Sequence, residues 1–371
     1  MGNAASKNGD DGSCPHHDLT ADPRTDFVGG FSFHEFSMIL SGVSCGITLL
    51  VMVFFTQMHA THLSNPTQQI KIMKIGALIS TYALVSFFAV TFPGAAVYMH
   101  PWLDVIEGTA LGSFFLLLCD YISPSQEQRE LFFAAKPKCG IRWFKLRWLQ
   151  IFQFGIIAVV LAVITNATAA TGAYCEWRRT PGSVNFWIRV IGAVSLVMAM
   201  LSILQVYGAT KVDLAHHRPL AKLFAFKAVV GLTFLQTIIF YILTSTNTLK
   251  ETDTLTFADV NIGIPNLIVS IEMIPLSVFF FYAYPWSVYL IHNPDGKASP
   301  DPQNSVQYSK PYQGGPLGVY AWMYMLSPID EVKAAIFAVR QFFTDRVSER
   351  GSDSHAMEHV PLAYQGQRMG P

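Results

Sequence analysis

Two charged side chains lie well inside long apolar stretches of the sequence. Glu272 comes about eight residues into the stretch Ile264–Ile291, and Lys227 lies about one turn into Leu223–Leu243. A charge at the middle of a bilayer costs at least ~2.5 to 3.5 kcal/mol, so it is rarely kept without a task. Glu272 and Lys227 therefore either pair beside a solute path or tie neighbouring helices together. A third alternative is that Lys227 extends to the membrane surface.

Further polar residues lie in the same apolar stretches. Gln236 falls on the face of its predicted helix opposite Lys227, so a hydrogen bond between helices is the plainer interpretation for it and for Asn266. Glu107 shares one helix face with Asp104, and Arg189 lies at the same level as a candidate partner. Asp120, at the end of that stretch, is expected to be solvated. The hypothetical solute path comprises Glu272, Lys227, Gln236, Asn266, Glu107 and Arg189.

The sequence argues against several other kinds of chemistry. The five cysteines are scattered, without a C-x-x-C pair or zinc-ligand spacing, so we expect no metal site and no cofactor. A retinal protein needs a lysine in its last span, and Ile264–Ile291 contains none. Cys119-Asp120-Tyr121-Ile122 lacks the arginine of the acid-Arg-Tyr triplet of G-protein-coupled receptors. Nucleotide-binding, serine hydrolase and zinc protease motifs are also missing, so an enzyme is not predicted.

The composition indicates that these polar residues are held by membrane-spanning helices. Of the 371 residues, 51% are hydrophobic and only 13% are charged, whereas soluble domains carry roughly 25% charged residues. The 25 basic residues balance the 25 acidic ones, which argues against a nucleic-acid partner and leaves the lipid bilayer. Seven stretches approach the roughly 20 residues that a spanning helix needs, which predicts an all-α, integral membrane bundle: Phe36–Met58, Met73–Phe92, Trp102–Ile122, Trp148–Thr165, Phe186–Tyr207, Leu223–Leu243 and Ile264–Ile291.

The loops between these stretches predict the orientation. Lys and Arg gather in the loops after the first, third and fifth stretches, whereas the alternate loops contain only Arg178, Arg179 and Lys250. Positive residues stay on the cytoplasmic side. The N-terminus is therefore expected outside or in a lumen, and the C-terminus in the cytosol.

The sequence outside the spans divides into four parts. Residues 1–35 are a polar extracytoplasmic N-terminus, 292–316 a flexible linker, 317–348 an interfacial and amphipathic cytosolic segment, and 349–371 a disordered end. Ser327-Pro328 is typical of a helix start. We expect a cytosolic helix that binds a partner through an apolar face, made of Ile329, Val332, Ile336, Val339 and Phe343.

Several residues are candidates for covalent modification. Met1-Gly2 opens an N-myristoylation pattern, which contradicts the outside N-terminus that the loop charges predict. Asn166 begins a glycosylation sequon close to the membrane. Cys139 is either a palmitoylation site in a basic loop or an idle thiol, and Cys14 and Cys175 share the outer side, where they could form a disulfide.

The last two spans contain recognisable motifs: Lys222-Leu223-Phe224-Ala225-Phe226-Lys227, Phe234-Leu235-Gln236, Glu272-Met273 and Tyr282-Ala283-Tyr284-Pro285-Trp286. His62–Gln69 adds a similar first loop. Over about Phe33–Ile291 the sequence resembles the organic solute transporter alpha family, which includes the transmembrane protein 184 group. Glu107 looks like the acid of the family's Tyr-Glu-Ala element, but Ile106 and Gly108 flank it here.

The resemblance implies seven helices and two alternative functions. One is a carrier of amphipathic solutes, such as steroid conjugates or bile acids, with a single-span beta-type subunit. The other is a vacuolar or endosomal scaffold whose tail recruits a cytosolic adaptor such as a lipidated ubiquitin-like autophagy protein. The long tail with its amphipathic helix is similar to the second kind, but it lacks that kind's plain aromatic-x-x-aliphatic docking motif. The expected location is accordingly the plasma membrane or a vacuolar or endosomal membrane.

Overall fold

The computed structural model describes residues 18–21, 23–136, 140–176, 181–214, 219–246, 248–290 and 312–341. Within these residues, seven helices are long and apolar enough to cross a membrane, which confirms the predicted all-α, multi-pass fold. They are α1 (Phe33–Thr61), α2 (Pro66–Thr91), α3 (Ala96–Ile122), α5 (Ile141–Ala170), α6 (Val184–Thr210), α7 (Pro219–Ser245) and α8 (Ile264–Ala283). A short helix that the hydropathy pattern did not predict, α4 (Gln126–Ala135), joins α3 to α5.

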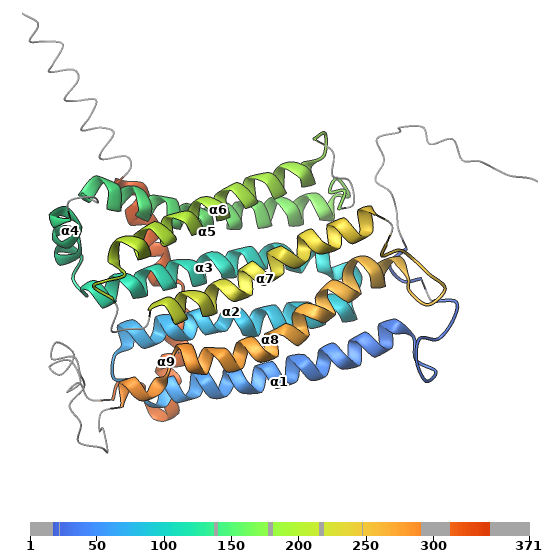
Figure 1. Ribbon diagram of the computed structural model, residues 1–371, viewed down its shortest axis with the longest axis horizontal. Coiled ribbons are helices and arrows are strands. Elements are labelled where there is room, and N and C mark those ends of the chain that lie inside the picture. Colours follow the sequence, from blue (N-terminus) through green and yellow to red (C-terminus); the bar gives the residue numbers. More distant parts are fainter. Residues whose placement is uncertain are drawn as a thin grey trace, which may run out of the picture.

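The spanning helices lie side by side along the long axis, and α4 lies across one end (Figure 1). We call this the α4 end, and the opposite end, where α1 begins, the Phe33 end. Helices α1, α2 and α8 pack together, α3 packs on α2 and α5, and α6 packs on α5. Helix α7 packs chiefly on α8.

Local sequence signals set several helix ends. Ser32 and Glu35 form a capping box at the start of α1, in which each side chain accepts a hydrogen bond from the other residue's backbone N–H. Thr256 and Asp259 form a similar reciprocal pair before α8. Through the π-helix η3 (Asp259–Gly263), this pair starts the last span ahead of the predicted Ile264.

The last span extends to Tyr289, close to the predicted Ile291, but its regular helix is shorter. Helix α8 ends at Ala283, because Pro285 disfavours the helical conformation at Tyr284, whose φ is −127° and ψ 68°. A 3-10 turn, η4 (Trp286–Tyr289), follows.

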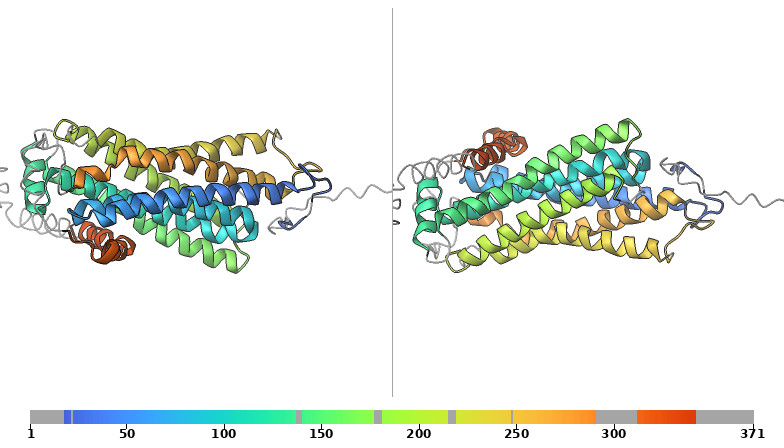
Figure 2. Two further views of the ribbon diagram at one scale, coloured as in Figure 1. Left: turned by 90° about the horizontal axis from the view of Figure 1, so that it is seen from below. Right: turned by 90° about the horizontal axis from the view of Figure 1, so that it is seen from above.

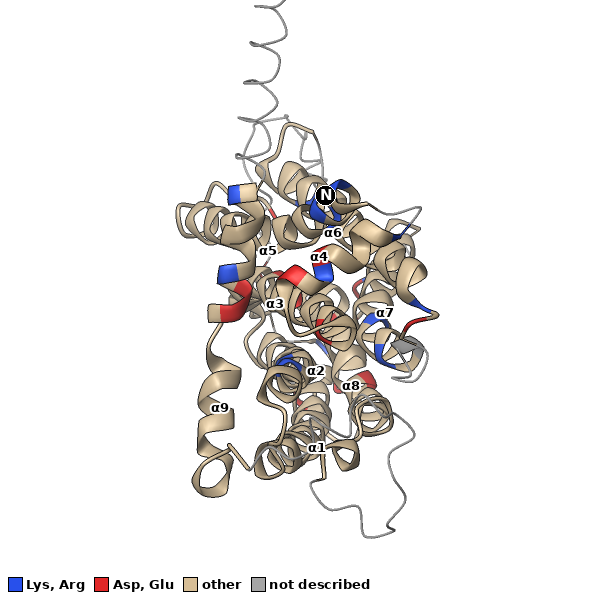
Figure 3. Ribbon diagram, turned by 90° about the vertical axis from the view of Figure 1, so that its left-hand side faces the viewer, with Lys and Arg blue, Asp and Glu red and all other residues tan. Residues whose placement is uncertain are grey.

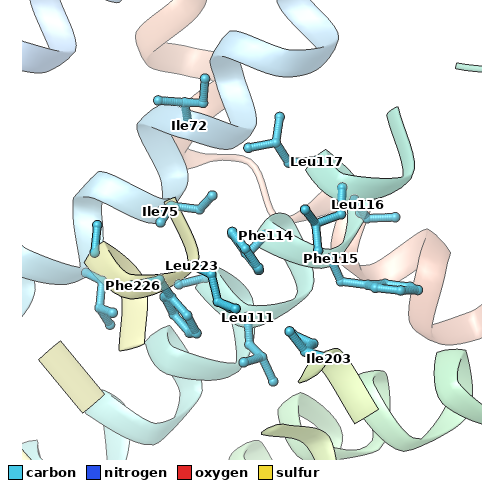
Figure 4. Close-up of a cluster of buried hydrophobic side chains, with 14 of the residues drawn as sticks. Ile72, Ile75, Leu111, Phe114, Phe115, Leu116, Leu117, Ile203, Leu223 and Phe226 are labelled. Atoms are coloured by element: carbon cyan, nitrogen blue, oxygen red, sulfur yellow. The ribbon is translucent and has the colours of Figure 1, made fainter. Parts of the chain in front are cut away.

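The half of the bundle toward the α4 end has a dense apolar core. Phe114 of α3 stacks on Phe226 of α7 with their ring centroids 5.8 Å apart, and Leu111, Ile203 and Leu223 surround them (Figure 4). Helices α3 and α5 approach so closely that a Cβ on Gly108 would lie 2.8 Å from the Cα of Gly155. Small residues at such contacts are typical of membrane bundles, whose larger apolar side chains face lipid.

Two further helices follow the seven spans. Helix α9 (Val319–Leu326) and a helix over residues 329–341 lie on one side of the bundle near the α4 end (Figure 2). The segment that precedes them also contacts the bundle from Tyr312 onward, since the Gln313 N–H donates to the Leu63 carbonyl at 3.1 Å. This end of the predicted linker is therefore packed.

Candidate functional site

The half of the bundle toward the Phe33 end contains a line of polar residues on α3. His100, Asp104 and Glu107 recur at intervals of four and three residues, so they share one face of the helix. Glu107 is only 4% exposed and accepts a hydrogen bond from the hydroxyl of Tyr82 on α2. Asp104, one turn nearer the Phe33 end, is exposed. The line therefore continues from a buried carboxylate to an accessible one.

A second polar contact joins α7 to α8. The Gln236 amide nitrogen donates to the carboxylate of Glu272, and the Gln236 oxygen, which is buried, has no hydrogen-bond partner within the described part of the chain. The expected pair between Glu272 and Lys227 does not form. Lys227 is half-buried and makes no ion pair among the described residues, because it lies on the other face of α7.

Asn266 links α8 to the line on α3. Its side-chain oxygen lies 3.3 Å from Nε2 of His100, and its side-chain nitrogen donates to the Ile262 carbonyl at 2.9 Å. Both Asn266 and Gln236 thus make the hydrogen bonds between helices that the sequence suggested as the plainer interpretation.

Arg189 of α6 approaches the same line from another side. Its guanidinium donates to the side-chain oxygen of Asn185 at 2.8 Å and lies close enough to Asp104 and His100 to act on both electrostatically. The Arg189 side chain is exposed, so it can still take up an anionic group. Among the described residues it forms no ion pair with Glu107 within 4.0 Å.

Several charged residues toward the α4 end are paired with protein groups. Asp120 was expected to be solvated, but its side chain is 7% exposed and forms ion pairs with Lys71 and with Arg129, the latter at 3.4 Å. Lys222 donates to the Tyr121 hydroxyl at 2.6 Å. Acidic and basic positions lie near one another around α3 and α4 when this end is viewed along the bundle (Figure 3). Apolar packing and these paired charges fill much of this half.

The tail helix packs on the bundle through a face with one acidic and two small residues. Glu331, Ala334 and Ala338 are buried against it. The predicted partner-binding residues Ile329, Val332, Ile336 and Val339 are all exposed. Phe343 lies outside the described residues.

The candidate modification sites divide between the described and undescribed parts of the chain. Asn166 lies within α5, with its amide toward the Trp102 indole and the Tyr98 carbonyl of α3, so a glycan there would have to displace that contact. Cys175 is disulfide-bonded. The predicted partner Cys14, the palmitoylation candidate Cys139 and Gly2 lie outside the described residues.

A family model described as organic solute transporter Ostalpha matches residues 37–289, which cover all seven spanning helices apart from the first turn of α1. The chain belongs to the organic solute transporter Ostalpha family. The predicted resemblance is confirmed, and the chain is a multi-pass membrane protein of a transporter family.

Two relatives of this Ostalpha-family chain illustrate how far the similarity extends. A transmembrane protein 184 homolog of Dictyostelium discoideum is 24% identical over 261 residues, which are 66% of this chain and 51% of the relative. Protein LAZ1 of Arabidopsis thaliana is 25% identical over 292 residues, 71% of this chain and 60% of the relative. The matches thus span between half and two thirds of those longer proteins. No solved structure matches.

Sequence reasoning missed two members of this polar site in the Ostalpha-family chain. His100 was detectable, because its spacing from Asp104 and Glu107 continues their helix face. Tyr82 had no such signal, since a lone tyrosine in an apolar stretch is also typical of a core. The structure therefore extends the hypothetical path by two residues and leaves Lys227 apart from the Gln236–Glu272 contact.

Proposed function

We propose that this chain is a carrier or facilitator for amphipathic organic solutes, with its N-terminus outside or lumenal and its tail cytosolic. The polar residues toward the Phe33 end form the solute site. The half toward the α4 end is the closed side of the path. Family membership supports a transporter role, and the distribution of polar groups supports this placement.

The difference between the two halves of the bundle carries this proposal. Near the α4 end, the interior is filled by Phe114, Phe226 and their apolar neighbours, and Asp120 is paired with Lys71 and Arg129. Near the Phe33 end, Asp104 and Arg189 are exposed. Ionisable groups at such depths are costly and typically mark solute paths. Polar access from one side with a seal on the other is expected of a carrier in one of its alternating states.

The chemistry of these residues favours a solute with both a hydrocarbon body and polar groups. Arg189 can bind a sulfate or carboxylate, and Asp104, Glu107 and Gln236 can accept hydrogen bonds from hydroxyl groups. Apolar side chains such as Leu103 and Ile106 flank this line and suit a rigid hydrocarbon. A steroid conjugate has these features.

The direct test is uptake of a radiolabelled steroid sulfate by liposomes that contain the purified full chain. We expect Glu107→Gln and Arg189→Gln to lower uptake by at least about tenfold, the effect of losing a charged hydrogen bond of roughly 1.5–3 kcal/mol. Glu251→Gln changes an exposed loop carboxylate and should leave uptake unaltered. Absence of protein-dependent uptake by the wild type, or equal uptake by all four proteins, would disprove the proposal.

The rival function is a vacuolar or endosomal scaffold that recruits a cytosolic adaptor. The exposed apolar face of helix 329–341 favours it, because such a face could receive a partner. Crosslinking from Ile336 to a cytosolic protein in cells would support this role.

A single-span beta-type subunit for the carrier remains a further proposal.

A further inference from the structure

The tail is attached to the bundle before its last helix begins. Gln57 of α1 donates to the Leu317 carbonyl at 2.9 Å and accepts from the Trp322 indole at 2.9 Å. Gly318 has a φ of +82° and lies against Ala60, where an added Cβ would come within 2.7 Å of the Ala60 Cβ. These contacts fix α9 beside α1 and α2, so the position of the following helix is determined from its start.

A buried ion pair attaches helix 329–341 to the interior of the bundle. The Lys74 ammonium donates to both carboxylate oxygens of Glu331, at 2.8 and 3.1 Å, and Ser113 donates a further hydrogen bond to the same carboxylate. The Lys74 and Glu331 side chains are 3% and 10% exposed. The Trp148 indole of α5 donates to the Ala334 carbonyl at 3.0 Å. The helix is thus bonded to α2, α3 and α5 together.

The depth of these contacts can be estimated from positions along the spanning helices. Ser113 precedes the end of α3 at Ile122 by nine residues, or ~13 Å, and Lys74 follows the start of α2 by ~12 Å. Helix α3 has 27 residues and is ~40 Å long, which exceeds a ~30 Å hydrocarbon core by ~5 Å at each end. The inner face of helix 329–341 therefore lies at a depth where acyl chains surround the bundle.

The outer face of the helix suits such surroundings. Ile329, Val332, Ile336 and Val339 point away from the bundle with exposed fractions of 55%, 49%, 48% and 37%. The exposed face of α9 continues this surface with Val319, Tyr320, Met323, Tyr324 and Leu326. Lys333 is exposed between Val332 and the buried Ala334, from where its amine can reach lipid phosphates. Together α9 and helix 329–341 present an apolar surface with a basic side chain.

We propose that helix 329–341 lies in the plane of the membrane, with its outer face embedded in the leaflet at the α4 end. Its partner is the boundary between phospholipid headgroups and acyl chains. A soluble adaptor would have to pass below the headgroups to reach Ile336, and the Glu331–Lys74 pair keeps the helix from rising toward it. The proposal does not depend on which solute the bundle carries.

Photo-crosslinking in membranes of cells that express the full chain tests this contact. A benzophenone side chain is introduced as Ile336→p-benzoylphenylalanine, with Lys333→p-benzoylphenylalanine as the control at the headgroup level. We expect irradiation at position 336 to give an adduct with the mass of one phospholipid, at a yield several times that at position 333. Protein adducts in place of lipid adducts at position 336 would overturn the proposal and favour the scaffold. Equal lipid yields at both positions would also overturn it.

A protease assay tests the anchor independently. Trypsin is applied to the α4 side of sealed vesicles, and cleavage after Lys333 is followed. Glu331→Ala should raise the cleavage rate by at least about tenfold, because the unpaired Lys74 no longer holds the helix. Asp330→Asn, which alters a carboxylate that is 56% exposed and 3.9 Å from Lys74, should change the rate little. Equal cleavage of Glu331→Ala and wild type would show that the helix is not anchored in this way.

Discussion

The hydroxyl of Tyr82 on α2 donates a hydrogen bond to the carboxylate of Glu107 on α3, inside the bundle. Both side chains are buried, at 6% and 4% exposed. Removal of a buried donor leaves its acceptor desolvated without compensation, so Tyr82→Phe should lower the free energy of unfolding by ~1–3 kcal/mol. Thermal unfolding in detergent measures this loss. Tyr98→Phe removes a hydroxyl from a 40% exposed ring and should be neutral; equal melting temperatures for the two variants would contradict the prediction.

The contact between Gln236 and Glu272 should appear as an energetic coupling. We expect a double-mutant cycle of Gln236→Leu and Glu272→Leu to give a coupling free energy of about 0.5–2 kcal/mol, the range found for hydrogen bonds between membrane helices. A cycle of Lys227→Met and Glu272→Leu should give no coupling free energy, since these two side chains are not in contact. Coupling of Glu272 to Lys227 in place of Gln236 would refute this arrangement of α7 and α8.

Removal of one partner of the Lys74–Glu331 ion pair should destabilise the protein strongly, whereas replacement of both by apolar residues should destabilise it little. Glu331→Ala leaves a buried ammonium without its partner, for which we expect a loss of ~3–5 kcal/mol. The double variant Lys74→Met with Glu331→Met should recover most of that loss, because it removes both buried charges. Guided by the same reasoning, we expect Lys74→Met alone to behave like Glu331→Ala. Unfolding by a denaturing detergent provides the measurement, and additive losses in the double variant would argue against a direct pair.

The close approach of α3 and α5 depends on Gly108. A methyl group there would lie 2.8 Å from the backbone of Gly155, so the two helices would have to move apart. Gly108→Ala should therefore destabilise the protein by ~1–3 kcal/mol. Gly231→Ala in α7 meets nothing within 4 Å and serves as the matched control. The prediction fails if both variants unfold at the same denaturant concentration.

Seven crossings would place the residues before α1 and those after α8 on opposite faces of the membrane. The charges of the loops predict an outside N-terminus and a cytosolic C-terminus. Epitope tags at the two ends, probed with antibody before and after the membrane is permeabilised, test this orientation. Both tags on one face would mean that one of the seven helices does not cross the membrane.

The sequence predicted the spanning helices well because each must satisfy its own backbone in lipid, which requires a long apolar stretch. It predicted charge pairing poorly. Glu331 lies 257 residues beyond Lys74, and Asp120 lies 49 beyond Lys71, so no local pattern connects them. The sequence predicted an apolar face on the tail helix but not which face packs on the bundle. The small residues Ala334 and Ala338 pack inward there, and the apolar face is exposed.

The Glu331–Lys74 pair also affects how the protein is made. Helix α2 enters the membrane with Lys74 before Glu331 has been synthesised, because Glu331 lies 257 residues further along the chain. A nonsense mutation between the end of α8 and codon 331 would leave that lysine permanently without Glu331 inside the second span. Premature termination in the tail would then harm the biogenesis of the transmembrane part, although every spanning helix had already been translated.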